Sequence, residues 1–173
     1  MVDVDAWVPL AEVARPHGVK GELRLKLYNR DSDLLLELDE VLVRLPDGEE
    51  HEVSIDAARR ADQSILLKLY SIDSRERADE MRGAQLCAKR SAFPPPGPGE
   101  FYVCDIVGAQ VTMPSGPLGT VRELRSYPSV DTLVVKALDG GRDWEVPLVA
   151  AFVREVDAAR GLVTLETIDG LER

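Results

Sequence analysis

The sequence predicts an all-β protein made of two small domains joined by a proline-rich linker. Two observations indicate the strands: alternating apolar and polar residues in the first half, and short apolar runs at near-regular spacing in the second. A third indicates the boundary, because Phe93–Gly99 holds four prolines and two glycines, which exclude a helix interior or a central strand. We therefore expect domains at 1–92 and 100–173 with a semi-rigid spacer at 93–99. A long surface loop within one domain is the alternative.

In the first half, the strand pattern is clearest at residues 21–28, where apolar and polar side chains alternate. One face of this strand carries Leu23, Leu25 and Leu27, and the other carries Arg24, Lys26 and Tyr28. Asp47–Gly48 has the composition of a tight hairpin turn. By the same reasoning we expect strands at 7–14, 21–28, 40–45, 51–60, 64–70 and 84–90.

One short helix is expected in the first half, within residues 73–83. Asp73 can cap its first turn, with Glu76 three residues later as the capping-box partner. Gly83 stands where a glycine commonly follows a helix end. A single helical turn is also expected within 31–40, capped by Asp31 or Ser32.

The second half repeats the strand theme with turns rich in glycine and proline. The expected strands span 108–113, 114–124, 131–138, 139–148 and 161–168. Short strands at this spacing in so few residues indicate a small barrel, since closing a sheet removes its exposed edges.

The formal net charge of −10 limits the classes of partner that the chain is expected to bind. Residues 1–92 hold 19 acidic and 14 basic residues, and residues 93–173 hold 12 and 7. Neither half therefore has the basic excess of a protein that coats nucleic acid. An acidic protein attracts basic partners and gains association rate from the attraction, so a strongly basic protein is the better partner.

The chain lacks the residue patterns of an enzyme or a metal protein. His17 and His51 have no serine, cysteine or acid at the spacing of a catalytic triad. Cys87 and Cys104 lack a CxxC partner and suggest neither a zinc site nor a disulfide framework. We expect no catalytic activity, no metal and no cofactor. An enzyme on a reductase-type barrel is the rival, and a bound flavin would reveal it.

The ends and apolar runs of the sequence point to a cytoplasmic protein. The first ten residues are acidic and lack the basic and apolar regions of a secretory signal. No apolar run approaches the length of a transmembrane helix. We therefore expect no membrane association.

The stretch from Arg15 to Arg30 is the one markedly basic segment. Its cations Arg15, Lys20, Arg24, Lys26 and Arg30 face a single acid, Glu22. It lacks the P-loop pattern, so Gly18 and Gly21 are expected to form a turn that leads into the strand. Arg15, Lys20, Arg24, Lys26 and Tyr28 are candidate contacts to an RNA backbone. The alternative is a solvated strand face paired with acids such as Glu49 or Glu52.

Three aromatic residues of the second half are candidate contacts to a protein partner. Phe101 and Tyr102 are adjacent, so in an extended segment one can enter the core while the other faces a partner. Tyr127 stands with a proline and a serine in a loop between two expected strands. The alternatives are that both members of the pair belong to the core and that the loop is only a connection.

Three stretches resemble the ribosome maturation factor RimM family: residues 13–26, 100–121 and 131–166. The element Gly18–Glu22 is moderately specific alone, and the three stretches in this order are strongly specific. The resemblance covers nearly the whole chain and implies a six-stranded N-terminal barrel similar to a translation-factor domain, followed by a PRC-type barrel. Phe101 departs from many relatives, which carry tyrosine there, so one hydroxyl is absent.

The resemblance also implies a function without catalysis. Members of this family assist maturation of the head of the small (30S) ribosomal subunit and processing of 16S rRNA. They bind small-subunit ribosomal protein 19, and the aromatic pair corresponding to Phe101 and Tyr102 is implicated in that contact. We expect a cytoplasmic monomer with protein 19 and the immature 30S subunit as partners. The rival is an RNA-binding module that acts through the basic N-terminal strand without a protein partner.

Overall fold

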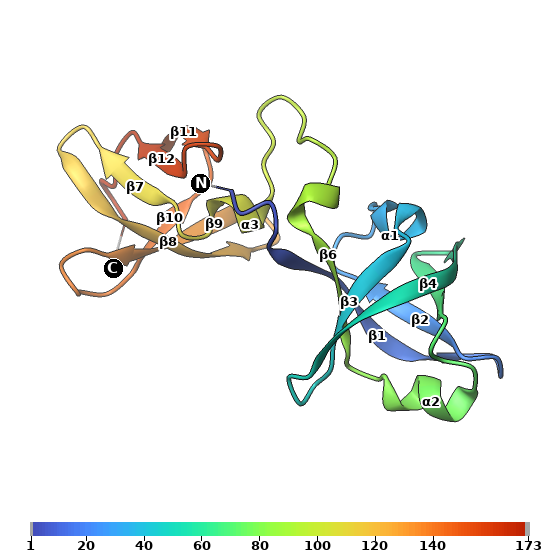
Figure 1. The fold of residues 1–173 in the computed structure, drawn as a ribbon. Helices are drawn as coiled ribbons and strands as arrows, with labels where there is room; N and C mark the ends of the chain where they lie inside the picture. The colour runs from blue at the N-terminus through green and yellow to red at the C-terminus, as the bar shows by residue number, and fades with distance from the viewer. Residues whose placement is uncertain (1, 172–173) are drawn as a thin grey trace. The chain divides into compact units, whose positions relative to one another are not determined.

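The computed structural model describes residues 2–171 and divides into two compact units (Figure 1). One unit spans Val4–Pro94, and the other takes the chain from Pro95 onward together with the residues that precede Val4. The division after Pro94 falls inside the proline-rich segment. Each unit has its own hydrophobic core. None of the helices within residues 2–171 is long and apolar enough to span a membrane.

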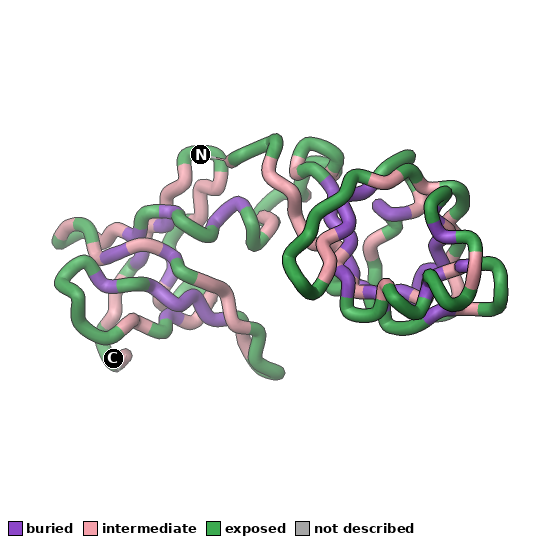
Figure 2. The backbone as a smooth tube through the Cα atoms, turned by 60° about the horizontal axis from the view of Figure 1, so that its bottom comes forward, coloured by how far each residue is buried: buried purple, intermediate pink, exposed green. Residues whose placement is uncertain are grey.

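The N-terminal unit is a closed barrel of six antiparallel strands in the order β1-β2-β5-β4-β3-β6 (Figure 1). Pairing between the first and last strands closes the ring. Figure 2 shows the buried residues along the strands of this ring and the exposed ones mainly in its loops. The strands are β1 (Trp7–His17), β2 (Glu22–Leu27), β3 (Glu40–Arg44), β4 (Glu50–Ala61), β5 (Ser64–Leu69) and β6 (Gln85–Lys89).

The apolar face of β2 lies inside the barrel, as the alternation predicts. Leu23 and Leu25 are buried and stand opposite Leu67 and Ile65 of β5. They belong to a core built almost wholly of aliphatic side chains from all six strands. Burial of each such side chain contributes about 1.5–3 kcal/mol, so this face fixes the register of β2.

The longer helix, α2 (Arg75–Glu80), is present, but the expected cap is wrong. Its N-cap residue is Ser74, whose hydroxyl accepts a hydrogen bond from the Arg77 backbone N–H at 3.3 Å. The cap thus lies one residue later than Asp73, and an arginine stands at the position where a capping box needs glutamate. Gly83 has the left-handed φ of +78° and ends the turn that follows the helix.

Two further short helical segments belong to the N-terminal unit. α1 (Leu34–Glu37) lies where a helical turn is expected, but its N-cap is Asp33 and no side chain caps it. The Ser32 hydroxyl instead accepts a bond from the Leu34 N–H at 3.4 Å, and Asp31 takes no part. A 3₁₀ turn, η1 (Arg90–Ala92), closes the unit and has no counterpart in the prediction.

The C-terminal unit is a six-stranded sheet curled into a half-barrel, in the order β10-β9-β8-β7-β12-β11 (Figure 1). β12 pairs with β7 in parallel, and the other neighbours are antiparallel. The closed ring expected here is therefore an open, curled sheet ending in β10 and β11. The strands are β7 (Gln110–Met113), β8 (Gly116–Ser126), β9 (Asp131–Ala137), β10 (Trp144–Pro147), β11 (Val153–Asp157) and β12 (Leu162–Leu165).

Two elements of this unit were not predicted. The helix α3 (Val103–Ile106) is a single turn that opens the unit and inserts Ile106 into the core. Strand β11 carries a bulge between Val153 and Glu155, which breaks the alternation that marks a strand in sequence. Glycines at 116 and 140 adopt positive φ in the connecting turns.

Candidate binding surfaces

The aromatic pair lies at the entrance to the C-terminal unit, directly before and at the start of α3. Phe101 is half-buried and packs against the core of this unit. Tyr102 is also half-buried, has an extended backbone, and forms the N-cap of α3, where its carbonyl accepts a bond from the Asp105 N–H at 2.9 Å. Neither ring is fully enclosed, so each retains surface for a partner.

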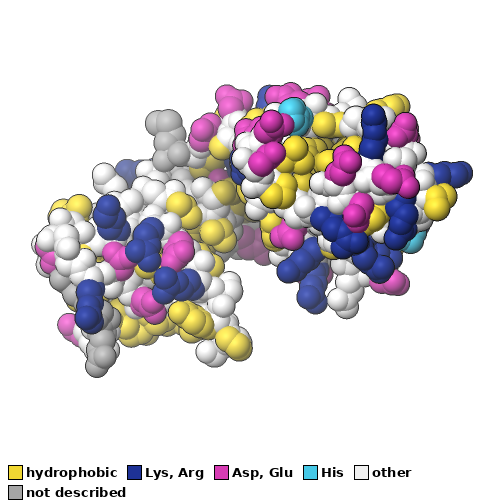
Figure 3. Space-filling model, turned by 90° about the horizontal axis from the view of Figure 1, so that it is seen from below, with side chains coloured by type: hydrophobic (Ala, Val, Ile, Leu, Met, Phe, Trp, Pro, Cys, Tyr) yellow, Lys and Arg dark blue, Asp and Glu magenta, His cyan; other side chains and the backbone are white. Residues whose placement is uncertain are grey.

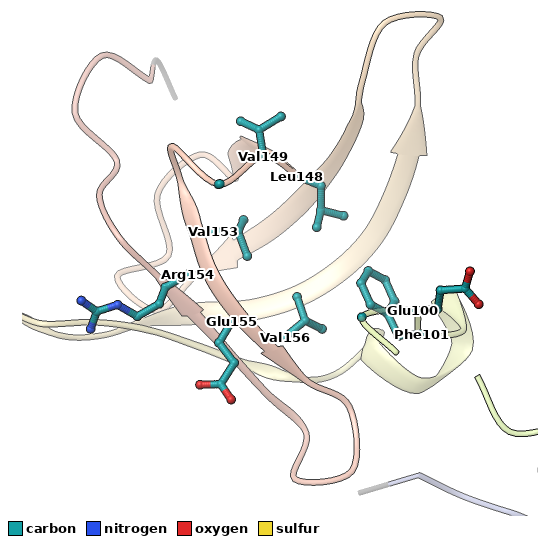
Figure 4. Close-up of a pocket in the computed structure, with 10 residues that line it drawn as sticks. Glu100, Phe101, Leu148, Val149, Val153, Arg154, Glu155 and Val156 are labelled. Atoms are coloured by element: carbon teal, nitrogen blue, oxygen red, sulfur yellow. The ribbon is translucent and has the colours of Figure 1, made fainter. Parts of the chain in front are cut away.

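Phe101 forms one wall of an open groove of about 450 Å³ (Figure 4). Figure 4 shows the side chains of Phe101, Leu148, Val153 and Val156 around its centre, whereas the charged side chains point away. Neither Tyr102 nor Tyr127 is among the described residues that line it. The lining residues are Gly99, Glu100, Phe101, Leu148, Val149, Ala150, Val153, Arg154, Glu155 and Val156.

The charge at the margin of the groove is negative. Arg154 is balanced by Glu166, because its Nε lies 2.9 Å from that carboxylate. Glu100 accepts only a backbone bond from Gly97 at 3.1 Å, and no ion pair within residues 2–171 engages Glu155. An apolar centre with two uncompensated carboxylates suits a segment that carries both apolar and basic side chains.

Tyr127 lies apart from the groove lining, in the loop between β8 and β9, and is 46% exposed. It contributes to a cluster centred on Arg125, whose Nη2 lies 2.7 Å from Glu123 and whose Nη1 lies 2.5 Å from Glu145. The hydrogen bond to Glu123, and then the one to Tyr127, raises the pKa of Arg125. The same contact with Arg125 lowers the pKa of Glu123. Tyr127 thus follows a charged cluster at the end of β8 and keeps an exposed face.

The predicted basic residues lie together on the outer face of the N-terminal barrel. Arg15 of β1 stands directly opposite Arg24 of β2, and Lys26 stands opposite Glu12. Tyr28 is 49% exposed, and its hydroxyl accepts a bond from the Gln85 side chain at 3.1 Å. Figure 3 shows that Lys and Arg side chains on this unit, seen from below, are interspersed with Asp and Glu.

The acids proposed as neighbours of these cations lie elsewhere. Glu52 stands on β4 opposite Leu42 of β3, and Glu49 lies in the hairpin loop beside His51. The nearest acids on the outer face are instead Glu12 and Glu22. The paired arrangement expected from Glu49 and Glu52 is therefore wrong.

Gly18 and Gly21 both occupy the turn between β1 and β2, with left-handed φ of +63° and +83°. A Cβ at position 21 would lie 2.5 Å from the Ile72 carbonyl oxygen, so only glycine fits there. Arg75 of α2 donates a bond to the Gly18 carbonyl at 3.0 Å. The turn, which presents the exposed Lys20, is thereby fixed against the segment that leads into α2.

Three residues of the outer face were missed in the sequence. Arg59 of β4 reaches the Glu22 carboxylate at 3.2 Å. Leu66 of β5 stands opposite Arg24 and is only 2% exposed, although it lies outside the barrel core. Tyr70 follows β5 and is 69% exposed. These residues join the outer face beside β2 only through strand pairing, which the sequence does not reveal. In addition, a bulge between Ile55 and Ala57 interrupts the alternation of apolar and polar residues in β4.

The histidines and cysteines sit in ordinary surroundings. His51 is exposed beside Glu49, with 3.4 Å between the two side chains, and His17 is half-buried at the end of β1. Cys87 is buried, and burial raises the pKa of its thiol; Cys104 is exposed. Across residues 2–171, no group of three or more histidine, cysteine, aspartate or glutamate side chains is placed to hold a metal ion.

A closed six-stranded barrel followed by a curled PRC-type sheet defines a two-domain β-barrel protein. The family model for the RimM N-terminal domain matches residues 8–93, and that for the RimM PRC barrel domain matches residues 103–171. The chain belongs to the RimM family of ribosome maturation factors.

The two relatives named first support this assignment. The ribosome maturation factor RimM of Sorangium cellulosum is 51% identical over 166 residues, covering 95% of this chain and 97% of the relative. That of Thiobacillus denitrificans is 34% identical, covering 96% of this chain and 86% of the relative. The solution structure of the N-terminal domain of RimM from Thermus thermophilus is 21% identical with a TM-score of 0.42, covering 51% of this chain and 95% of that domain.

Proposed function

We propose that this chain is an assembly factor for the 30S subunit that binds small-subunit ribosomal protein 19 through its C-terminal unit. In this role it assists maturation of the subunit head and processing of 16S rRNA. The observation that carries the proposal is the open groove walled by Phe101, whose margin bears the uncompensated carboxylates of Glu100 and Glu155. The factor works in the cytoplasm as a monomer and without catalysis.

The chemistry of the groove matches a basic protein that must otherwise bind RNA. Phe101 and Leu148 provide apolar surface for a side chain of the partner, while Glu100 and Glu155 attract its cations. We expect Tyr102, next to Phe101 in the chain, and the exposed Tyr127 to add contacts outside the groove. Aromatic anchors near the centre of an interface commonly carry at least 2 kcal/mol each.

Release follows from the same electrostatics. The rRNA site of a ribosomal protein offers a dense row of phosphates, and this site competes with the few carboxylates at the groove for the same cations. The factor therefore shields the basic protein until the head of the subunit folds. Once the RNA site has formed, the ribosomal protein passes to it and the factor dissociates.

Isothermal titration of purified protein 19 into the full chain tests the proposal. We expect Phe101→Ala combined with Tyr102→Ala to weaken binding by about 30-fold or more, the equivalent of 2 kcal/mol. Tyr28→Ala, an exposed aromatic of the other unit, is the matched control and should bind as the wild type does. Circular dichroism establishes that each variant is folded.

The rival, an RNA-binding module without a protein partner, gives the opposite result. It has one observation in its favour, which is the juxtaposition of Arg15 and Arg24 on the outer barrel face. If the chain acts only in that way, protein 19 shows no heat of binding to the wild type. Recovery of neither protein 19 nor immature subunits with the tagged chain from a lysate would likewise defeat the proposal.

A further inference from the structure

We propose that the outer face of the N-terminal barrel binds a single-stranded segment of RNA, with cations on the phosphates and a tyrosine at each end against a base. This face, termed the basic face, spans parts of β1, β2, β5 and β4. Its RNA-contacting residues are Arg15, Lys20, Arg24, Lys26, Tyr28, Arg59 and Tyr70. The inference does not depend on the binding of protein 19 by the other unit.

Two arginines form the centre of the basic face. Arg15 and Arg24 are direct cross-strand partners on β1 and β2. Like charges placed opposite one another destabilise a sheet, so this pair is explained better by a ligand than by the fold. Lys26 lies two residues beyond Arg24 on the same face, a step of about 7 Å along the strand. Together they offer three positive charges to a chain of phosphates.

The cations of this face outnumber its acids, because only Glu12, opposite Lys26, and Glu22 lie among the five cations. No ion pair within residues 2–171 engages Arg15, Lys20, Arg24 or Lys26. Arg59 is the exception, because its guanidinium lies 3.2 Å from the Glu22 carboxylate. The face therefore keeps a net positive charge inside a unit that is acidic as a whole, which singles it out for an anionic ligand.

Arg24 is held in place by an apolar support. Leu66 stands between Arg24 of β2 and Arg59 of β4 in the sheet register, and it is buried although it faces outward. Arginine side chains commonly cover such apolar surface with their aliphatic stems. The Nε of Arg24 is buried, and no hydrogen bond within the described residues satisfies it. One donor of the guanidinium is thus left without a partner among the described residues.

A tyrosine stands at each end of the basic face. Tyr28 follows β2, and its ring is oriented by the hydrogen bond from Gln85. Tyr70 follows β5 and lies at the opposite end, because β2 and β5 are antiparallel and Glu22 pairs with Lys68. β2 is six residues long, or roughly 20 Å, which accommodates a strand of several nucleotides.

The combination favours RNA over an acidic protein. Cations alone would suit either ligand, but exposed aromatic faces that flank a row of cations are the arrangement that binds single-stranded nucleic acid. Tyr70 is the more exposed of the two rings, at 69%, and its ring has a free face for a base.

Fluorescence anisotropy with the full chain and a labelled 12-nucleotide single-stranded RNA of mixed sequence tests the inference. Arg24→Ala combined with Lys26→Ala should weaken binding and reduce the slope of log affinity against log salt by about 1.4, or 0.7 per lost phosphate contact. Tyr28→Ala combined with Tyr70→Ala should weaken binding by about 30-fold or more, at about fivefold for each ring, and leave the slope unchanged.

Three controls make the outcome decisive. Arg44→Ala combined with Arg82→Ala removes two cations that are paired with Glu50 and Asp79, and should bind RNA as the wild type does. Arg15→Ala combined with Lys26→Ala also removes two positive charges, but it keeps Arg24, which stands opposite Leu66. Polyglutamate of matched charge should compete poorly with the RNA.

Several results would overturn the inference. Equal losses in the control and the basic-face variants would show that only overall charge matters. Unchanged RNA affinity in both basic-face charge variants would show that the basic face does not bind RNA. Efficient competition by polyglutamate would show that the face binds an acidic protein instead. Binding of protein 19 by the same variants separates this failure from failure of the proposed function, because the two sites lie in different units.

Discussion

Replacement of Gly21 by alanine tests how the turn of the N-terminal barrel is built. The added Cβ would lie 2.5 Å from the Ile72 carbonyl oxygen, and φ at this position is +83°. The left-handed conformation costs an alanine about 1–2 kcal/mol, and the overlap with backbone adds about 1–3 kcal/mol. We therefore expect the free energy of unfolding to fall by about 2–5 kcal/mol.

Gly18→Ala is the matched control, because φ is +63° there but nothing lies within 4 Å of the added Cβ. It should cost only the conformational part, about 1–2 kcal/mol. Urea unfolding of the full chain, followed by Trp7 fluorescence in a Trp144→Phe background, reports on the N-terminal unit alone. Equal urea midpoints for the two glycine variants would refute the role of the Ile72 contact.

Three further results are expected. Ser74→Ala should lower the free energy of unfolding by about 1 kcal/mol through loss of the α2 cap, whereas Asp73→Ala should change it by less, as urea midpoints will show. Cys87 should resist a thiol reagent in the folded chain and react on unfolding, because burial keeps it as the neutral thiol, while the exposed second cysteine reacts at once. Arg125→Ala should raise the pKa of Glu123, as an NMR titration will show, because the hydrogen bond from Arg125 lowers that pKa in the folded chain. The stability that this pair contributes is therefore present above the pKa of Glu123 in the unfolded chain, and it is lost as pH falls through the lower pKa of the folded chain.

In the N-terminal barrel, β2 could be predicted from sequence because its apolar and polar residues alternate. The leucines of β2 alternate because each packs inward, and the structure places Leu23 opposite Leu67 and Leu25 opposite Ile65. A pattern of period two is a local consequence of facing a core, so it is readable in a single strand. The turn at Gly18 and Gly21 is readable for a similar reason, since both glycines adopt positive φ.

Elements that break this periodicity could not be predicted. β11 carries adjacent charges at Arg154 and Glu155 because a bulge lets two residues oppose one, and the alternation is lost. The α2 cap was misplaced by one residue because Asp73 and Ser74 are both good capping residues, and sequence does not decide which one takes the extended backbone. The open edge between β10 and β11 depends on sheet curvature, which no local pattern encodes.

The candidate surfaces were predicted in part for the same reason. Arg24, Lys26 and Tyr28 share a strand, so their common face follows from sequence alone. Arg59 and Tyr70 join them only through the pairing of β2 with β5 and of β5 with β4, which is a long-range property. The partners of Phe101 in the groove likewise come from residues 148–156, far along the chain.

Hydrogen–deuterium exchange of the full chain with and without protein 19 tests the central proposal most directly. Binding through the groove predicts slower exchange at residues 99–102 and 148–156, with β1 and β2 unchanged. The Phe101→Ala and Tyr102→Ala double variant should lose that protection under the same conditions. Protection confined to the N-terminal barrel, or no protection at a saturating concentration of protein 19, would contradict the proposal.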